Sequence, residues 1–430
     1  MTSSDRIFYP LYLTNTLTRK KEKFRSEREG QVKMFTCGPS VYKNQHLGNY
    51  RTFLYEDILQ RYLSYLGYDV QRVINFTDVE DKAIEQAHRR GIGLDELTAP
   101  VIERFFSDAR KLRIALPEFI PRATNCADSA AHIIKVLLDK GHVYRLGPDA
   151  YFDPLTFEGF GKLFGLDMSR WPKKRRLFGE DTYPGQRWNL GDFIVWHGCK
   201  GKHDICWNTE IGHGRPSWNI QDPAMILQTL GTWVDISCGG VDNLYRHHDY
   251  TIAIMESYSN RTFANYWLHG EHLFIDGQKM SKTKGNVLSV QSLIDQGYTP
   301  QEIRFFLTYS QYRRKLNITT QTVSDAGRKR ERILRSIRDA FHGPYAPDPK
   351  IGGDRLYYRE LLEEFEQKMS DDLDVQGTID AVDAKLQQLA EHKRDGKLGE
   401  QVVSQFWDVL ARIDQVLQLG LSSVVQHANA

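Results

Sequence analysis

Residues 32–49 read VKMFTCGPSVYKNQHLGN, and this stretch decides the fold. The apolar run Val32–Thr36 predicts a buried strand, which the Gly-Pro-Ser turn at 38–40 ends. A helical pattern of apolar residues follows at 48–66, and Asp69–Phe76 predicts a second strand. Strand, loop, helix and strand in this order form a βαβ unit, whose loop lies at the carboxyl edge of a parallel sheet.

The loop His46-Leu47-Gly48-Asn49 predicts a site for an anion. A helix N-terminus offers free N–H groups and a partial positive charge, and Gly48 lets a ligand approach the backbone. The side chains of His46 and Asn49 are able to hydrogen-bond phosphate oxygens. Read alone, such residues are more often those of an ordinary helix start, so the motif needs a partner elsewhere in the chain.

A second stretch with chemical character, KMSKTKGN at 279–286, follows a predicted strand and an Asp-Gly turn. Lys279 and Lys282 flank a small polar residue. Such a pair suits a pyrophosphate whose negative charge grows in a transition state. By itself, a lysine-rich loop is typical of a solvated surface.

The composition limits the class of protein. A chain of 430 residues is long enough for several domains, and a net charge of +2 means that nucleic acid must be held by local basic patches. Five cysteines, an odd and scattered set, favour a reducing compartment over a disulfide framework. No apolar run approaches the roughly 20 residues that span a bilayer, so we expect a cytoplasmic protein with no membrane partner.

The two stretches together resemble the HIGH and KMSKS signatures of class I aminoacyl-tRNA synthetases. Within that class the chain is similar to cysteinyl-tRNA synthetases, from about residue 7 to residue 320. The shared motifs are FTCGPSVY at 35–42, HLGNYRT at 46–52, NFTDVEDK at 75–82, GDF at 191–193, GRPSW at 214–218, GGVD at 239–242 and HH at 247–248. So many motifs in one order identify the chain as a member of this family.

The resemblance implies an α/β fold with a Rossmann-type catalytic domain, an inserted subdomain and an all-α helical bundle. The periodic patterns agree, because α/β signals stop near residue 115, return after Trp218 and give way to helical patterns from Pro300. We therefore expect the first half of the catalytic domain at 1–115, a connective insertion at 116–215, the second half with the KMSKS-like loop at 216–300, and a truncated anticodon-binding-like bundle at 301–430.

The resemblance also implies a reaction. Such enzymes condense an amino acid with ATP, in the presence of Mg²⁺, to an aminoacyl-adenylate and pass the acyl group to an acceptor. No protein nucleophile takes part, so catalysis consists of positioning and of neutralising charge. The positions that match the ATP site are His46 and Asn49 for the triphosphate, Lys279 and Lys282 for the leaving pyrophosphate, Gly240 and Asp242 for the ribose, and Gly48, Met280 and Ser281 beside them. As an alternative, Asp242 is a helix N-cap.

The amino-acid pocket departs from the family. The resemblance implies a Zn²⁺ ion held by two Cys, one His and one Glu, which takes the substrate thiolate. Here Cys37 and His247 match, but Asp222 replaces the second Cys and Thr251 replaces the Glu. Cys37, Asp222 and His247 are enough for a three-ligand site with an open position. The loss of two anionic ligands out of three nevertheless favours a pocket without zinc, with vestigial ligand positions.

Residues around the glycine-rich loop bear on the same question. Cys238 and Asp249 lie near enough in sequence to replace the lost ligands. Where the family carries a His that reaches toward the substrate thiol, this chain has Ser237. That change favours a pocket that no longer recognises a thiol.

Without zinc a cysteine thiol has lost its binding partner, so we expect a different amino acid. An Asp222 carboxylate that faces a metal-free pocket needs a cation or a hydrogen-bond donor, which favours a polar or cationic substrate side chain. By the resemblance, Trp218 lines the pocket and Ser40 and Thr77 lie near the α-amino group. Two alternatives stay open: Asp222 caps a helix that starts at Pro223, or the chain is an authentic cysteine–tRNA ligase that acts on tRNA(Cys).

The acceptor is inferred from basic clusters and from the end of the chain. Clusters at 173–176, 313–315 and 328–338 are able to contact the phosphates of an RNA strand, although each alone is typical of a solvated face. The chain stops at Ala430, without the module that helps full-length members read an anticodon, and so resembles shortened ligases that act on a small amine. We therefore expect tRNA or a small amine-bearing acceptor. The alternative is a non-catalytic relative that binds RNA or protein. The intact lysine loop argues against this alternative, because a protein that only binds does not need it.

Overall fold

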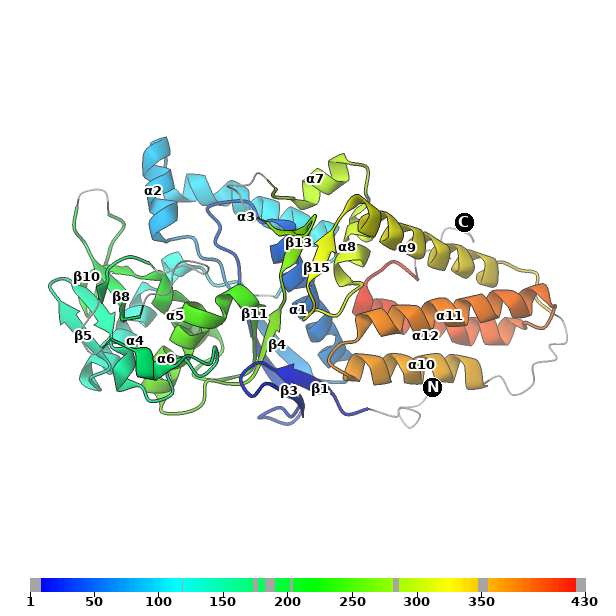
Figure 1. Ribbon diagram of the computed structural model, residues 1–430, viewed down its shortest axis with the longest axis horizontal. Helices are drawn as coiled ribbons and strands as arrows, with labels where there is room; N and C mark the ends of the chain where they lie inside the picture. The colour runs from blue at the N-terminus through cyan, green and yellow to red at the C-terminus, as the bar shows by residue number, and fades with distance from the viewer. Residues whose placement is uncertain are drawn as a thin grey trace.

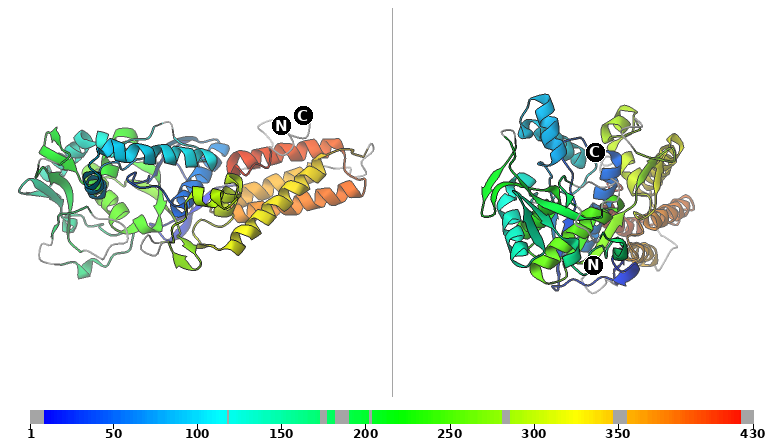
Figure 2. Two further views of the ribbon diagram at one scale, coloured as in Figure 1. Left: turned by 90° about the horizontal axis from the view of Figure 1, so that it is seen from above. Right: turned by 60° about the vertical axis from the view of Figure 1, so that its left-hand side comes forward.

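The computed structural model describes residues 9–117, 119–172, 177–181, 190–201, 204–280, 286–346 and 355–422. Three parts follow one another along the longest axis: a mostly antiparallel sheet with its helices, a central parallel sheet, and a helical bundle (Figure 1). Seen from above, the long helices of the bundle run lengthwise beyond the central sheet (Figure 2). In these described ranges no helix has the length and apolar character needed to cross a membrane.

The central sheet contains the βαβ unit predicted around residues 32–76. Its strands are β3 (Gln31–Thr36), β4 (Asp69–Ile74), β11 (Val234–Gly240) and β12 (Ala264–Gly270). All four are parallel, in the order β12-β11-β3-β4. β3 and β11 come from distant parts of the sequence, yet Met34 lies opposite Ile236. The α/β fold with an interrupted parallel sheet is therefore confirmed.

Three helices accompany the first half of this sheet. α1 (Leu47–Tyr65) joins β3 to β4, and its buried residues recur at helical spacing, among them Leu54, Ile58 and Tyr62. α2 (Asp81–Arg90) and α3 (Leu94–Lys111) follow β4. α3 begins at Leu94, where Gly93 takes the N-cap position and acidic residues fill the first turn.

The insertion builds a second, mixed sheet in the order β5-β6-β8-β10-β9, with β7 beside β8. Its strands are β5 (Val143–Leu146), β6 (Asp149–Phe152), β7 (Leu177–Phe178), β8 (Asp192–Gly198), β9 (Trp207–Thr209) and β10 (Gly212–Pro216). α4 (Ala127–Asp139), α5 (Trp218–Thr229) and α6 (Asp249–Ser259) share a core with this sheet. Sequence reasoning missed β8, because every residue of it is buried and it shows no alternation of apolar and polar residues.

The C-terminal helices confirm the helical pattern after Pro300. They are α8 (Pro300–Thr308), α9 (Thr320–Phe341), α10 (Arg355–Ser370), α11 (Val375–Arg394) and α12 (Glu400–Leu417). The smaller elements are β1 (Tyr12–Asn15), β2 (Lys20–Lys23), β13 (Leu273–Ile275), β14 (Gln278–Lys279), β15 (Leu316–Ile318) and α7 (Val290–Asp295). The β1–β2 hairpin is tied to the bundle, since the Thr14 hydroxyl donates to the Asp372 carboxylate at 2.6 Å.

The starts of two helices affect the site, and the first differs from the helix start at Pro223 that the sequence offered as an alternative. α5 begins at Trp218 with Ser217 at its N-cap, so Asp222 lies inside the helix and does not cap it. The second helix, α6, begins at Asp249. The five residues before it are irregular, with Arg246 at a φ of 72°. That kink separates the glycine-rich loop from α6.

One pair of cysteines departs from the expectation of unpaired thiols. Cys199 and Cys206 form a disulfide, whereas Cys37, Cys126 and Cys238 are free. The end of β8 and the start of β9 bring the pair together, which sequence spacing alone did not indicate.

Candidate active site

A cavity of about 300 Å³ lies at the carboxyl edge of the central sheet, and both signature stretches contribute to its wall. From the predicted ATP site it is lined by His46, Gly48, Asn49, Gly240, Asp242, Lys279 and Met280. From the predicted amino-acid site it is lined by Cys37, Ser40, Thr77, Trp218 and His247. Asp222 and Ser237 do not line it; both are buried behind its wall. Ser281 and Lys282, like the basic cluster at 173–176, lie outside the described residues.

At the nucleotide end, the start of α1 is held open toward the cavity. His46 takes the N-cap position, and its backbone N–H donates to the Asn49 side chain at 3.2 Å. A Cβ on Gly48 would lie 2.9 Å from the Met280 methyl group and 3.1 Å from the His46 ring. A larger residue at this position would displace the Met280 methyl group or the His46 ring, so glycine lets the two signature stretches approach closely. The partial positive charge of the helix faces the cavity, as an anion site requires.

The glycine-rich loop after β11 presents a carboxylate to the same end. Asp242 is exposed in a short 3₁₀ turn over Val241–Asn243 and caps no described helix, so the N-cap alternative is wrong. A Cβ on Gly240 would lie 2.5 Å from an Asp242 carboxylate oxygen, so a larger residue here would push the Asp242 side chain out of its position. The arrangement suits a sugar that donates hydroxyl hydrogens to Asp242.

Lys279 reaches the cavity with a partner that the sequence did not reveal. Its Nζ lies 3.2 Å from His272 Nε2, and both residues line the cavity. Burial lowers the pKa of His272, and the charge of Lys279 lowers it further against the opposing effect of Asp242. A neutral His272 accepts a hydrogen bond from the ammonium group and so orients it.

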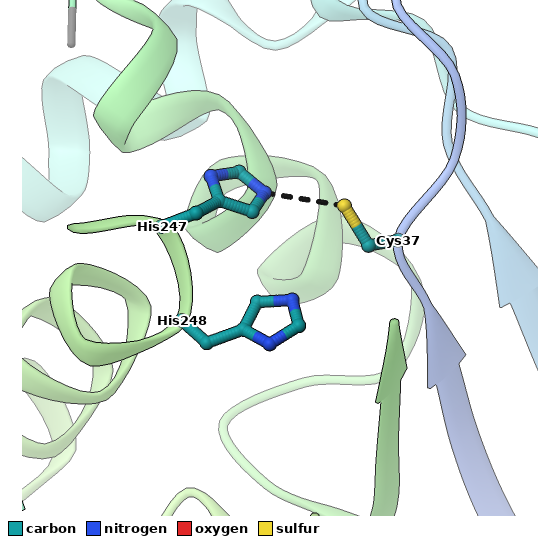
Figure 3. A group of neighbouring side chains, drawn as sticks. All are labelled: Cys37, His247 and His248. Carbon is teal, nitrogen blue, oxygen red and sulfur yellow. Dashed lines mark hydrogen bonds between the residues drawn. The ribbon is translucent and has the colours of Figure 1, made fainter. Parts of the chain in front are cut away.

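At the amino-acid end, three side chains meet that are far apart in sequence. Cys37 Sγ lies 3.2 Å from His247 Nε2 and 3.6 Å from Asp222 Oδ2, and His247 Nε2 lies 2.8 Å from the same oxygen. Figure 3 shows Cys37 facing the His247 ring, with His248 below them. Trp218 stacks on His247 with ring centroids 4.2 Å apart. Burial and the negative charge of Asp222 raise the pKa of Cys37, which keeps an unliganded thiol protonated.

Asp222 is not the unpaired carboxylate that the sequence suggested. Its Oδ1 accepts a hydrogen bond from the Asn75 amide at 2.9 Å, and its Oδ2 pairs with His247. The argument for a cationic substrate side chain therefore loses its basis, because the buried charge already has partners within the protein.

The other positions considered as replacement ligands do not join this cluster. The Thr251 hydroxyl donates to the carbonyl of His247, just before α6, at 2.9 Å. The Asp249 carboxylate accepts hydrogen bonds from the backbone of Leu163 and Phe164, both at 3.0 Å. Cys238 is buried in the apolar core of the central sheet. None of the three offers a free ligand atom to Cys37.

His248 is the neighbour that the sequence analysis did not single out. Its Nδ1 lies 2.8 Å from His269 Nε2, whereas its buried Nε2 has no hydrogen-bond partner in the described part of the chain. A ligand atom of His248 lies within 4.8 Å of Cys37 Sγ and of a His247 ring nitrogen. Burial and two neighbouring His residues lower the pKa of His248, so its ring stays neutral and able to bind a metal.

An ionic network from the insertion holds the start of α5. Asp181 accepts hydrogen bonds from the Trp218 backbone at 2.8 Å and from His197 at 2.9 Å. Arg215 pairs with both Asp181 and Asp81. Asp181 is buried, yet His197 and Arg215 hold its pKa below the usual range. Its negative charge stands at a helix N-terminus, where it fixes Trp218 in the pocket wall.

Known proteins share both sequence and fold with this chain. The family model described as "tRNA synthetases class I (C) catalytic domain" matches residues 23–328. A cysteine–tRNA ligase of Chlamydia caviae is 36% identical over 412 residues, which cover 95% of this chain and 85% of the relative. The corresponding ligase of Chlamydia pneumoniae is 40% identical over 370 residues, which cover 85% and 77%. That of Leptospira interrogans is 34% identical over 410 residues, which cover 94% and 86%.

Solved structures share the fold at low identity. Methionyl-tRNA synthetase of Mycobacterium tuberculosis bound by methionyl-adenylate superposes with a TM-score of 0.67 at 13% identity, covering 92% of this chain and 93% of that one. A putative arginyl-tRNA synthetase of Campylobacter jejuni gives a TM-score of 0.58 at 11% identity, covering 93% and 94%. Identities this low support the architecture alone.

Proposed function

The chain belongs to the cysteinyl-tRNA synthetase family of class I aminoacyl-tRNA synthetases, and from this premise we propose that it activates cysteine with ATP and transfers the cysteinyl group to tRNA. It is an aminoacyl-tRNA synthetase-type ligase, which uses ATP and Mg²⁺ as its class does. The amino acid and the acceptor are the proposed parts. Location in the cytoplasm stays a prediction from the sequence.

The observation that carries the proposal is the convergence of Cys37, Asp222 and His247. Their sulfur, oxygen and nitrogen atoms lie 2.8–3.6 Å from one another. Donor atoms on one tetrahedral Zn²⁺ ion lie about 3.3–3.7 Å apart, since the bonds measure about 2.0–2.3 Å. Small side-chain shifts bring the three into that range, so the residues fit a zinc ion with an open position. The number of ligands in the sequence predicted a pocket without zinc, and that prediction stays untested. The positions of the donor atoms instead support a pocket that binds zinc.

The ion, when bound by these three residues, would supply a soft Lewis acid for the substrate thiolate, which a serine hydroxyl matches poorly. The remaining tasks fall to the protein itself. Ser40 and Thr77 line the same end of the cavity and suit the α-amino group. Trp218 covers the side of His247 and excludes water from the pocket.

At the other end, the groups aimed at the cavity are those that a nucleoside triphosphate needs. The N-terminus of α1, with His46 and Asn49, receives the phosphates, and Asp242 receives the ribose hydroxyls. The carboxylate of the amino acid attacks the α-phosphate in line, and Lys279 neutralises the charge that develops on pyrophosphate. No side chain acts as nucleophile, and the protonated Cys37 thiol is unsuited to the role.

A second candidate, an altered amino-acid specificity, is favoured by one specific contact. The 2.8 Å pair between His247 and Asp222 is also a complete hydrogen bond without metal. If His247 and Asp222 bind each other and no metal, the pocket would bind a small polar substrate side chain through hydrogen bonds to Ser40 and Thr77. No described residue favours a small amine over tRNA as acceptor, and that alternative stays a prediction from sequence.

The test is amino-acid-dependent exchange of pyrophosphate into ATP, measured with each of the twenty amino acids on the purified full chain. We expect exchange with cysteine and charging of a tRNA pool with labelled cysteine. If exchange occurs only with an amino acid other than cysteine, the result supports the second candidate and contradicts the first. Cysteine-dependent exchange without any tRNA charging would overturn the acceptor assignment and leave the activation step intact.

A further inference from the structure

A second group of soft ligands lies in the insertion, apart from the catalytic cavity. Cys199 and Cys206 form a disulfide, and a ring nitrogen of His213 lies within 4.8 Å of both sulfur atoms. None of the three lines the cavity. The cysteines are partly buried and His213 is exposed, so solvent, reductants and ions reach the group. Its elements, β8, β9 and β10, lie at the end of the molecule opposite the bundle (Figure 1).

The sheet holds the three residues in place. The Cys199 backbone N–H donates to the His213 carbonyl at 3.2 Å, which extends the β8–β10 pairing. His213 lies opposite Asn208 in the β9–β10 pair. On either side of Cys206, Ile205 and Trp207 pack against the core of the insertion. The backbone therefore keeps two sulfur atoms and one imidazole together, whatever the redox state of the cysteines.

The disulfide is accessible to reductants. It is partly exposed and closes a short loop, and such bonds are accessible to attack by a thiolate. Reduction by an added dithiol gives the bond two electrons and two protons, which leaves two thiols here and a disulfide on the reductant. The chain has three further free thiols, including Cys37 in the pocket, so conditions that keep Cys37 reduced also act on this pair.

We propose that Cys199, Cys206 and His213 form a second Zn²⁺ site when the two cysteines are reduced. Two thiolates and one imidazole are a donor set that Zn²⁺ prefers, and exposure leaves the fourth position to water. Binding releases the two thiol protons to solvent. The same sulfur atoms hold either the disulfide bond or the ion, so oxidation expels the metal.

The site has a structural consequence for the active centre. β10 contains Arg215, which pairs with Asp181, and the chain then leads through Ser217 to Trp218 in the pocket wall. A zinc ion at Cys199 and Cys206 closes the same loop as the disulfide and holds β10 against β8. We expect its loss to lower thermal stability of the insertion more than it lowers the exchange rate.

The experiment measures bound Zn²⁺ by elemental analysis, on full chain purified with zinc under a dithiol reductant and then desalted. Wild type is compared with Cys199→Ser, His213→Ala and Cys37→Ser. Cys126→Ser is the matched control, because Cys126 is a buried thiol bonded to the Ala123 carbonyl and belongs to neither group. We expect the second site to hold one equivalent of zinc, which Cys199→Ser removes and Cys37→Ser leaves in place. A disulfide-forming oxidant should release this equivalent.

The outcomes separate this inference from the proposed pocket zinc. Equal zinc in wild type, Cys199→Ser and His213→Ala overturns the second site, whatever happens at Cys37. Zinc that survives complete oxidation of Cys199 and Cys206 overturns it as well. Circular dichroism on each variant shows that it is folded. If Cys199→Ser fails to fold, zinc-dependent protection of Cys199 and Cys206 from alkylation in the reduced wild type decides the matter.

Discussion

The two ends of the active-site cavity differ in how the sequence specifies them. At the nucleotide end, His46, Gly48 and Asn49 belong to one helix start, where function follows from local geometry. At the amino-acid end, Cys37, Asp222 and His247 come from three separate elements. The role of each depends on the partners it meets in space. A motif is therefore informative about the first end, whereas the side chains that meet at the second end are known only from the assembled structure.

The largest expected effect belongs to the nucleotide end. We propose that Lys279 acts mainly in the transition state, so we expect Lys279→Ala to lower kcat for pyrophosphate exchange by about 10²–10³-fold. The KM for the amino acid should stay within about twofold, because Lys279 lies at the other end of the cavity. Lys20→Ala, in the exposed strand β2, is the matched control. Unchanged kcat in Lys279→Ala would remove this residue from the mechanism.

A pH-dependent effect is expected from Glu80, in the cavity wall. Both of its carboxylate oxygens are buried. Burial and the negative charge of Asp181 raise the pKa of Glu80 from 4.5 to about 8, although the positive charges of Lys82 and Lys43 oppose this shift. The Glu80 carboxyl group therefore loses its proton at a lower pH in the unfolded protein than in the folded protein. As a result, the free energy of unfolding falls as the pH rises from about 5 to 8.

Glu80→Gln removes this titration. We expect the variant to gain on the order of 3 kcal/mol in unfolding free energy at pH 8 relative to wild type, and little at pH 5. Urea denaturation at four pH values measures the difference, with Glu85→Gln, an exposed residue of α2, as control. Parallel pH profiles for Glu80→Gln and wild type would contradict the assignment.

At the amino-acid end, Asp222→Asn keeps the shape of the side chain but removes its charge. We expect the KM for cysteine to rise by about 10–100-fold and bound pocket zinc to decrease, since a neutral amide is a poor ligand. The KM for ATP should not change. Asp128→Asn, exposed at the start of α4, controls for loss of a carboxylate. A KM for cysteine equal to that of wild type would show that Asp222 is a structural residue only.

The smallest effect is expected at Thr251. Its hydroxyl is bonded to the His247 carbonyl and does not face Cys37. Thr251→Ala should therefore leave both zinc content and the KM for cysteine within about twofold of wild type. A larger loss, measured in the same exchange assay, would place Thr251 among the ligands and reopen the comparison with the family's Glu.

Local patterns in the sequence were sufficient for the βαβ unit, the parallel sheet and the bundle. They failed where a residue's environment comes from elsewhere. Asp222 was expected to be unpaired because its partner Asn75 lies in another segment. Asp181, which anchors Trp218, stands in a stretch without periodicity and has no local signal. The pairing of Cys199 with Cys206 depends on β8, a strand too uniformly buried to be recognised.

The most direct test of the central claim is whether cysteine activation depends on zinc in the pocket. Pyrophosphate exchange with cysteine is measured on the Cys199→Ser variant before chelation, after removal of zinc, and after zinc is restored. We expect one equivalent of zinc, exchange that is lost and regained with it, and no metal in the Cys199→Ser/Cys37→Ser double variant. Full cysteine-dependent exchange in zinc-free protein, or exchange only with another amino acid, would contradict the account.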